Sequence, residues 1–587
     1  MKDFFKYLLA TIVGMIIMTF IGLFIFFSMM AGFISSFGTS SEAATVLKPN
    51  SVYQLDLSGV LTERSQDDPF SDVFLSEFFG EDAKSIGLDD VLKNIEKAKN
   101  NENITGIYLK GGLLSGGYAQ IKEIRDALVD FKSSGKFIVA YADMYSQRNY
   151  YLASVADKVL LNPSGTLDFK GIASQTTFYK NTLEKLGIEM QIVKVGTFKS
   201  AVEPYSETKM SDANRNQVTA YIRSIWNNLL KEVSASRNIS VENLNAYADQ
   251  MMLYQPAEKA VEYNFVDGLA YADEVEDILT SYTDGASVEY VKHGEMNRVT
   301  ETKKLEKNRI AVIYAVGAID SGDRDGINST KLIKTIDEVT QNESVKGVVF
   351  RVNSPGGSAY GSEQIWRALM RLKEKKPLVV SMGDYAASGG YYISCMADHI
   401  FAEPNTLTGS IGIFGAIPNF DGLNRKIGLT FDGVKTNKMS DAIDLNRAFR
   451  PEERDLMQMY VNRGYELFVK RCADGREKTG DEIKAIAEGR VWTGEDALGL
   501  GLVDELGGLK KAVEKAAEKA NLSDFRIAEY PEKEDFTTKL LKNLSSTIET
   551  SVVKAQLGEF YPTYKKMNVA RKMNGIYALT PYDITVY

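Results

Sequence analysis

Cysteine and histidine are scarce in this chain of 587 residues, which contains two of each. Two cysteines, Cys395 and Cys472, are too few for a disulfide framework or a cysteine-rich zinc site. The two histidines leave little imidazole for metal binding or for general-base catalysis. Any catalytic base in this protein is therefore expected to be another residue type.

Excess positive charge is also missing. The formal net charge is −9, and no long run of lysine and arginine with interleaved aromatics occurs, so nucleic acid is not an expected partner. The glycine-containing loops lack the lysine of a phosphate-binding P-loop and the spacing of a dinucleotide fingerprint. We therefore expect no cofactor and no metal. With 44% hydrophobic and 25% charged residues, the composition predicts a globular protein, and the length predicts roughly two to four domains.

One long uncharged run lies near the N-terminus. Leu8 to Met30 contains 23 residues without a charge, which as a helix can cross about 30 Å of hydrocarbon. A cleaved signal peptide is the alternative, because an Ala-Ala pair follows at 43–44, but its apolar core is expected to span only about 7–15 residues. Lys2 and Lys6 precede the run and Glu42 is the first charge after it, so the pattern predicts an anchor with a cytoplasmic N-terminus.

After the anchor, short β-rich runs alternate with amphipathic helical patterns, which is typical of α/β domains. The pattern occurs twice. Asn149 to Pro163 matches Gly390 to Pro404 at an offset of 241 positions, with Tyr-Tyr, Ala-Asp and Pro in register. The charged segment Asn297 to Arg309 has no apolar periodicity and is interpreted as the linker between the two halves. The sequence therefore predicts an internal duplication.

The predicted organisation is a membrane anchor over 1–45, a first repeat over 46–300, a second repeat over 301–530 and a C-terminal tail over 531–587. An insert at 70–84 contains four phenylalanines and has no counterpart in the second half. Its aromatics either pack locally or face a partner, lipid or apolar substrate. No role is predicted for the tail.

The segment Ser381 to Tyr392 follows a buried strand pattern and leads into a helical one. Ser388 is expected at this turn, where N–H groups of a helix N-terminus favour developing negative charge. This placement is typical of a nucleophile, and the alternative is an N-cap serine followed by packing glycines. The first half has Gln147 at the equivalent position, so the fold of the turn does not require a serine.

A second glycine-containing loop follows the strand pattern Val348 to Val352. Glycines at this place let the backbone approach a ligand and direct N–H groups toward it. The N–H groups of Gly357 and Gly389 are candidates for the two donors of an oxyanion hole, each typically worth about a hundredfold in rate. The two loops are therefore predicted to form one active site.

The base for a nucleophilic serine is expected to be a lysine. A Ser–Lys pair works when the amine is desolvated, so that its pKa falls from about 10.4 toward 7. Lys199 lies among apolar and small residues in Val195 to Val202, in contrast to the many lysines of mixed-charge helices. His399 is the alternative base, but its counterpart in the first half is Lys158, which indicates a surface position.

Three motifs follow one another along the chain. They are Gly196 to Pro204 (GTFKSAVEP), Gly383 to Tyr391 (GDYAASGGY) and Thr408 to Gly412 (TGSIG). Together they resemble the bacterial signal peptide peptidase SppA (protease IV) family, in its long, duplicated, membrane-anchored form. The resemblance extends from the anchor to about Leu509 and does not include the tail.

The resemblance implies an α/β protein of two tandem ClpP/crotonase-like repeats after an N-terminal transmembrane helix, assembled as a homotetramer. It implies a Ser–Lys endopeptidase that degrades cleaved signal peptides and other apolar peptides. The enzyme would be a single-pass protein of the bacterial inner membrane, with its catalytic part on the periplasmic side. Ser388 would be the nucleophile, Lys199 the base, and Ser410 a residue that orients the lysine.

Two questions remain open at this point. Single-repeat relatives take the catalytic serine and lysine from one repeat type. Lys438 lies at roughly the corresponding place in the second half and is therefore an alternative base. Its neighbours are more polar than those of Lys199 and favour a protonated amine. The other question is the reaction class. A crotonase-like acyl-CoA enzyme, which has the same fold and oxyanion hole, is one alternative, and a non-catalytic membrane scaffold that retains only the fold is the other.

Overall fold

A computed structural model describes residues 6–7, 13–15, 17–22, 24–25, 28, 44–65, 85–283, 285–300, 306–320, 326–533, 575–579 and 585–586. The predicted membrane segment, Leu8 to Met30, lies partly outside these residues, and the predicted insert at 70–84 lies wholly outside them. In the described part of the chain, no helix is both long and apolar enough to cross a membrane. The fold is mixed α/β.

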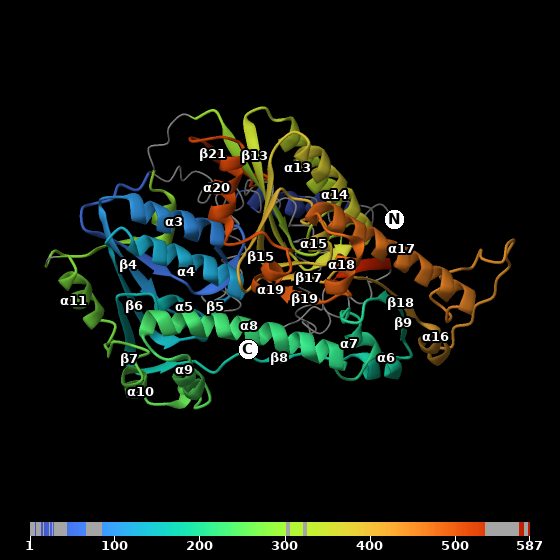
Figure 1. The fold of residues 1–587 in the computed structure, drawn as a ribbon, viewed down its shortest axis with the longest axis horizontal. Helices are drawn as coiled ribbons and strands as arrows, with labels where there is room; N and C mark the ends of the chain where they lie inside the picture. The colour runs from blue at the N-terminus through green and yellow to red at the C-terminus, as the bar shows by residue number, and fades with distance from the viewer. Residues whose placement is uncertain are drawn as a thin grey trace.

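Two parallel sheets form the centres of the two halves of the molecule (Figure 1). The first sheet has six strands, and each neighbouring pair is parallel. In spatial order they are β10 (Gly268–Leu269), β7 (Lys158–Leu167), β6 (Phe137–Tyr145), β4 (Ile104–Lys110), β1 (Ser51–Asp56) and β11 (Glu289–Lys292).

The second sheet repeats this arrangement. Six of its strands, again all parallel, are β20 (Glu505–Leu506), β16 (His399–Ala402), β15 (Leu378–Ala387), β13 (Val345–Ser354), β12 (Arg309–Val316) and β21 (Arg526–Tyr530). Two further strands extend it beside β15, namely β17 (Leu407–Gly409) and β19 (Val491–Thr493). The strand order of the first sheet therefore recurs in the second, as the duplicated sequence predicts.

Both faces of each sheet are covered by helices, which explains the continuous apolar strands. In β12, Ala311 and Ile313 face one core with α13 (Ser329–Gln341) and α14 (Ala359–Lys373), whereas Ile310 and Val312 face another with α20 (Leu509–Lys519). In the first sheet, α11 (Glu274–Ser281) packs on the face that carries Val139. Successive strand residues alternate between faces, so each strand contributes to two apolar layers.

The helices of the first half are α3 (Leu88–Asn100), α4 (Tyr118–Lys132), α5 (Gln147–Ala153), α6 (Lys180–Leu186), α7 (Glu203–Ser206), α8 (Asp212–Arg237), α9 (Val241–Ala248), η2 (Met252–Tyr254), α10 (Ala257–Glu262), α11 (Glu274–Ser281) and α12 (His293–Asn297). Those of the second half are α13 (Ser329–Gln341), α14 (Ala359–Lys373), α15 (Gly389–Tyr392), α16 (Asp421–Lys426), α17 (Pro451–Arg476), α18 (Gly480–Ile486), α19 (Gly494–Gly499) and α20 (Leu509–Lys519).

One segment of the first half crosses to the second. Strand β9 (Glu189–Val195) pairs antiparallel with β18 (Ile413–Asn419), which belongs to the second half. The chain then returns along α8, the long helix that runs beneath both halves in Figure 1. Tyr221, Ile225 and Leu229 of α8 are buried in the first core. The loop between β9 and α8 is thereby held against the second sheet.

Short strands complete the fold. Strands β14 (Gly356–Ser358), β22 (Gly575–Leu579), β18 and β9 form a four-stranded sheet in that order. Two other small sheets comprise β3 (Ser85–Gly87), β2 (Gly59–Thr62) and β5 (Leu114–Ser115), and β23 (Thr585–Val586) with β8 (Ser174–Gln175).

A buried ionic cluster joins the two halves. Arg351 of β13 has no solvent exposure, and its guanidinium lies 2.8 Å from Glu63 and 2.6 Å from Glu123. Both carboxylates come from the first half. Removing one partner of such a buried pair typically costs about 3–5 kcal/mol, so the cluster favours one relative placement of the halves.

Candidate active site

Ser388 lies at the turn between β15 and α15. Its backbone has φ 57° and ψ −115°, a conformation that costs a residue with a side chain about 1–3 kcal/mol. The N–H donates to Gly409 O at 2.8 Å, and the side chain is buried without a helix-capping hydrogen bond. Ser388 therefore stands at the N-cap position of α15, but with neither the extended backbone nor the side-chain hydrogen bond that a capping serine usually has.

The two glycines after Ser388 leave no room for a side chain, because β14 and Ser362 of α14 lie against Gly389 and the end of β13 lies against Gly390. A Cβ on Gly389 would approach Ser362 Oγ to 2.7 Å and the Gly357 nitrogen to 3.1 Å. A Cβ on Gly390 would lie 2.5 Å from a backbone oxygen. The turn therefore brings Gly357 and Gly389, the two predicted oxyanion donors, next to each other.

Lys199 reaches this turn from the first half, in the loop that follows β9. Its Nζ lies 2.6 Å from Ser388 Oγ, although 189 positions separate the two residues. The side chain has no solvent exposure. Burial lowers the pKa of Lys199 well below its ordinary value of 10.5, because the ammonium form loses its hydration. More of this amine is therefore neutral near pH 7 than of an exposed lysine.

Ser410 also contacts the lysine amine. Its carbonyl oxygen and its Oγ each lie 3.1 Å from Lys199 Nζ. Ser410 Oγ donates its own proton to Gly489 O at 3.2 Å, which leaves a lone pair for the lysine. A neutral amine has two N–H donors and one lone pair. The two Ser410 oxygens match the donors, and the Ser388 hydroxyl matches the lone pair.

The sequence did not indicate the residues that hold the Lys199 loop in place. Gly489 has φ 75°, and a Cβ there would lie 2.7 Å from Lys199 Cβ. The Phe198 N–H donates to Glu488 O at 2.9 Å. Gln217 of α8 donates to Phe198 O at 3.0 Å. Of these residues, only Gly489 has a feature that the local sequence shows, namely that it is a glycine. The contacts themselves join segments that are distant in the sequence, so no local pattern indicates them.

The alternative bases lie elsewhere. His399 is in β16, with Nε2 3.5 Å from Glu505 and its ring against Phe401. The Lys438 side chain is 71% exposed and pairs with Glu452 at 2.9 Å. Neither residue contacts Ser388 in the described hydrogen bonds.

Gln147, the counterpart of Ser388, holds a loop of the first half in place through its side-chain hydrogen bonds. Its amide donates to Tyr118 Oη at 2.9 Å and accepts the N–H groups of Lys170 and Gly171 at 3.1 and 3.0 Å. The first repeat therefore uses this position to fix its own loop.

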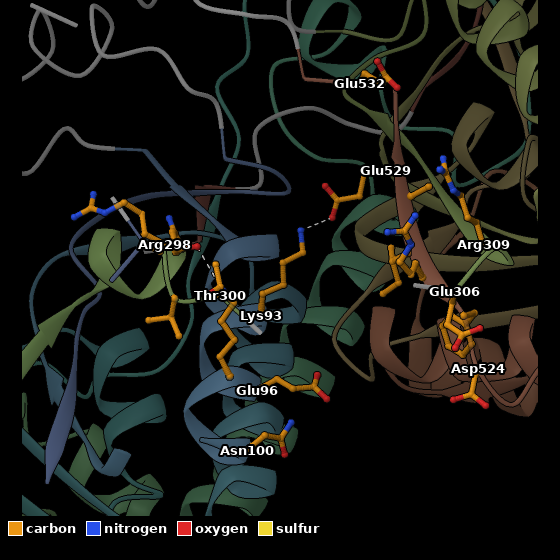
Figure 2. Close-up of a pocket in the computed structure, with 18 of the residues that line it drawn as sticks. Lys93, Glu96, Asn100, Arg298, Thr300, Glu306, Arg309, Asp524, Glu529 and Glu532 are labelled. Carbon is orange, nitrogen blue, oxygen red and sulfur yellow. Dashed lines mark hydrogen bonds and ion pairs between the residues drawn. The ribbon is translucent and has the colours of Figure 1, made fainter. Parts of the chain in front are cut away.

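A cleft of about 1260 Å³ opens between α3 and β21 (Figure 2). Its walls carry both signs of charge, and Lys93 spans it to reach Glu529 at 2.6 Å. None of its described lining residues is a predicted site residue. Within the described ranges, no three His, Cys, Asp or Glu side chains are grouped so as to hold a metal ion.

The chain is similar to a known family of peptidases. The model of a family described as peptidase family S49 matches residues 130–285 and 370–523. Protease 4 of Salmonella typhi is 37% identical over 516 residues, covering 85% of this chain and 83% of that protein. Protease 4 of Haemophilus influenzae is 34% identical over 521 residues, covering 85% and 84%.

A plant relative extends the comparison. The chloroplastic serine protease SPPA of Arabidopsis thaliana is 33% identical over 450 residues, covering 74% of this chain and 66% of that protein. These relatives are named as proteases, so neither an acyl-CoA enzyme nor a non-catalytic scaffold finds support among them. This chain belongs to peptidase family S49.

Proposed function

We propose that this chain is a membrane-anchored endopeptidase that uses Ser388 and Lys199 as a catalytic dyad. The observation that carries the proposal is the 2.6 Å contact between Lys199 Nζ and Ser388 Oγ, both fully buried. A desolvated, neutral amine at hydrogen-bond distance from a hydroxyl is the arrangement that general-base activation of a serine requires.

The reaction begins with the transfer of the Ser388 hydroxyl proton to Lys199 Nζ, while Oγ bonds to the peptide carbonyl carbon. The carbonyl oxygen becomes an oxyanion, and the N–H groups of Gly357 and Gly389 hold it. Loss of one such donor typically costs about a hundredfold to a thousandfold in kcat. The C–N bond then breaks as the Lys199 ammonium protonates the leaving amine. The product of this half-reaction is an ester on Ser388.

The second half-reaction regenerates the enzyme. Lys199 takes a proton from a water molecule, whose oxygen attacks the ester carbonyl at the same oxyanion site. Collapse of the intermediate releases the carboxylic acid, and the proton returns from Lys199 to Ser388 Oγ. Ser410 is a positioning residue, because its two oxygens hold the amine with its lone pair directed at Ser388.

The proposed substrates are cleaved signal peptides and other apolar peptides. Leu8 to Met30 is proposed as a single-pass anchor in the bacterial inner membrane, with the catalytic part in the periplasm. The uncharged run and the lysines before it support this placement. The two halves are proposed as ClpP/crotonase-like repeats with the boundaries predicted above, the first supplying the base and the second the nucleophile. Protease accessibility of intact spheroplasts tests the topology, and protection of the catalytic part would contradict it.

Labelling with a serine-directed fluorophosphonate, together with hydrolysis of an apolar peptide, tests the dyad. The intact chain should label and cleave, Ser388→Ala should do neither, and Lys199→Ala should lose about a thousandfold or more in kcat. Lys438→Ala is the matched control and should retain full activity. Near-normal cleavage by Lys199→Ala would contradict the proposed base.

Ser410 is tested by Ser410→Ala, with Ser394→Ala as a control. Ser394 is also a buried hydroxyl, and it donates to Gly390 O at 2.7 Å without contacting Lys199. A positioning role predicts a kcat about tenfold lower with unchanged KM for Ser410→Ala alone. Equal effects of the two substitutions would indicate general destabilisation.

A further inference from the structure

Strand β22, near the C-terminus, lies between β14, which carries Gly357, and β18, which follows Ser410 in the chain. Gly575–Leu579 pairs antiparallel with β14, so that Ala578 is opposite Gly357. On its other edge it pairs antiparallel with β18, where Tyr577 is opposite Phe414. The segment is therefore a central strand with a backbone partner on each side, although it is far in sequence from both partners.

Each strand beside β22 leads to residues of the proposed active site. Strand β14 carries Gly357, the proposed oxyanion donor, and lies against the turn at Ser388. Strand β18 begins three residues after Ser410, and the next strand, β9, ends four residues before Lys199. A backbone inserted between β14 and β18 consequently runs past the proposed catalytic groups.

The edge of β14 suits the close approach of another backbone. Its residues are Gly356, Gly357 and Ser358, so two of its three positions have no side chain. An extended peptide that adds to a strand edge gains its affinity from main-chain hydrogen bonds and is recognised largely without regard to side chains. A groove with a strand edge on each side, one of them largely without side chains, accepts extended peptides of many sequences.

We propose that the groove between β14 and β18 binds the extended backbone of peptide substrates, and that the chain's own Gly575–Leu579 occupies it as an intramolecular pseudosubstrate. This inference rests on the proposed peptidase function and assigns a role to the C-terminal tail. Ser388 has no solvent exposure while β22 is in place. On this proposal, a substrate displaces the tail strand before its carbonyl carbon reaches Ser388 Oγ.

Proline at position 577 tests this occupancy in the full-length protein. Tyr577 is opposite residues of both neighbouring strands, and proline cannot donate an N–H and is excluded from central strands. Tyr577→Pro should raise kcat/KM for a short apolar peptide by about tenfold, because apparent affinity scales with the fraction of open sites. Tyr577→Val is the matched control and should behave as the wild type, since valine favours strands.

A synthetic peptide with the sequence of residues 573–582 provides the second measurement. It should inhibit Tyr577→Pro competitively, and it should inhibit the wild type less, because the wild-type groove is already filled. Equal activity of the wild type and Tyr577→Pro, with no inhibition by the peptide, would overturn the proposal. Activation by Tyr577→Val equal to that by Tyr577→Pro would also overturn it, because the effect would then not depend on backbone pairing.

Two further measurements test whether the occupant is intramolecular, and distinguish a failure of the tail's proposed role from a failure of the proposed peptidase function. Wild-type specific activity should be unchanged over a tenfold dilution, and a rise on dilution would contradict an intramolecular occupant. Fluorophosphonate labelling of Ser388 reports on the peptidase itself. If Tyr577→Pro neither labels nor cleaves although it is folded, the proposed function fails. If the wild type and Tyr577→Pro label and cleave equally, only the role of the tail fails.

Discussion

Ser388 combines a strained backbone with a fully buried hydroxyl. A positive φ is accessible to glycine without the penalty that a Cβ carries, whereas serine adopts it at a cost. We therefore expect Ser388→Gly to be more stable than Ser388→Ala by about 1 kcal/mol, since the greater unfolded-state entropy of glycine offsets part of the gain. Urea unfolding of both inactive variants checks this, and equal midpoints would show that the turn carries no strain.

Lys199 should make the stability of the wild type depend on pH. Burial lowers the pKa of this amine, so between its lowered value and 10.5 the unfolded chain binds a proton that the folded chain does not. Because the unfolded state binds more protons, stability rises with pH in this range, by at most about 1.4 kcal/mol per pH unit. The wild type should therefore gain stability relative to Lys199→Met between pH 7 and pH 10.

Urea unfolding at several pH values measures this gain. Lys438→Met removes an exposed lysine and serves as the control. A difference between the wild type and Lys199→Met that stays constant from pH 7 to pH 10 would mean that Lys199 is charged in the folded protein. The general-base role would then lose its physical basis.

At the scale of elements, strand β15 is attached to helix α4 of the other half through Asp384. The carboxylate accepts the N–H groups of Ala119 and Gln120 at 3.0 and 3.1 Å. Burial, and then the nearby charge of Glu63, raise the pKa of Asp384 to about 7. Asp384 lies four positions before Ser388, so this contact links the first half to the nucleophile turn.

The raised pKa of Asp384 predicts a pH effect of opposite sign to that of Lys199. The folded chain keeps this proton while the unfolded chain releases it near pH 4, so the stabilisation is complete below that pH and is lost as the pH rises through about 7. Asp384→Asn cannot titrate and keeps an oxygen for the α4 N–H groups. Its stability relative to the wild type should increase between pH 4 and pH 8, by up to about 4 kcal/mol.

Thermal or urea unfolding of Asp384→Asn and of the surface variant Asp337→Asn provides the comparison. Asp337 lies on α13 and pairs with Arg371 in solvent. If the two variants show the same pH profile, the Asp384 carboxylate does not carry the proton proposed for it.

The strands and the duplication could be predicted from the sequence because their signals are local. Apolar runs such as Val348 to Val352 become buried parallel strands, and the 241-position match becomes two sheets of one strand order. The crossing of β9 onto β18 was not predictable in this way, because pairing partners are chosen by tertiary packing. Likewise, Ser388 stood out in its motif, whereas the contacts that Phe198, beside Lys199, makes with Glu488 and Gln217 had no local pattern.

At the scale of the whole molecule, the crossing strand β9 has a counterpart in the second repeat that pairs with no strand in the described part of the chain. Residues 187–195 match 428–436 at the same offset of 241, with Gly187 and Gly428 both at positive φ. In the first repeat this segment forms β9 and pairs with β18 of the next repeat. In the second repeat Phe431 is 59% exposed and Val434 fully exposed. A pairing that repeats from one chain to the next gives a head-to-tail contact, which closes into a ring if the rotation allows.

We predict that segment 428–436 of each chain packs on the first repeat of the next chain, which would build the homotetramer that the sequence resemblance implies. Phe431→Asp combined with Val434→Asp should then dissociate the detergent-solubilised protein into monomers in analytical ultracentrifugation, because buried charges oppose the contact. Tyr254→Asp, also at an exposed aromatic, is the control and should leave the assembly intact. Both variants should still label at Ser388, since Lys199 and Ser388 meet within one chain. A double variant that sediments like the wild type would show that this segment is not the interface.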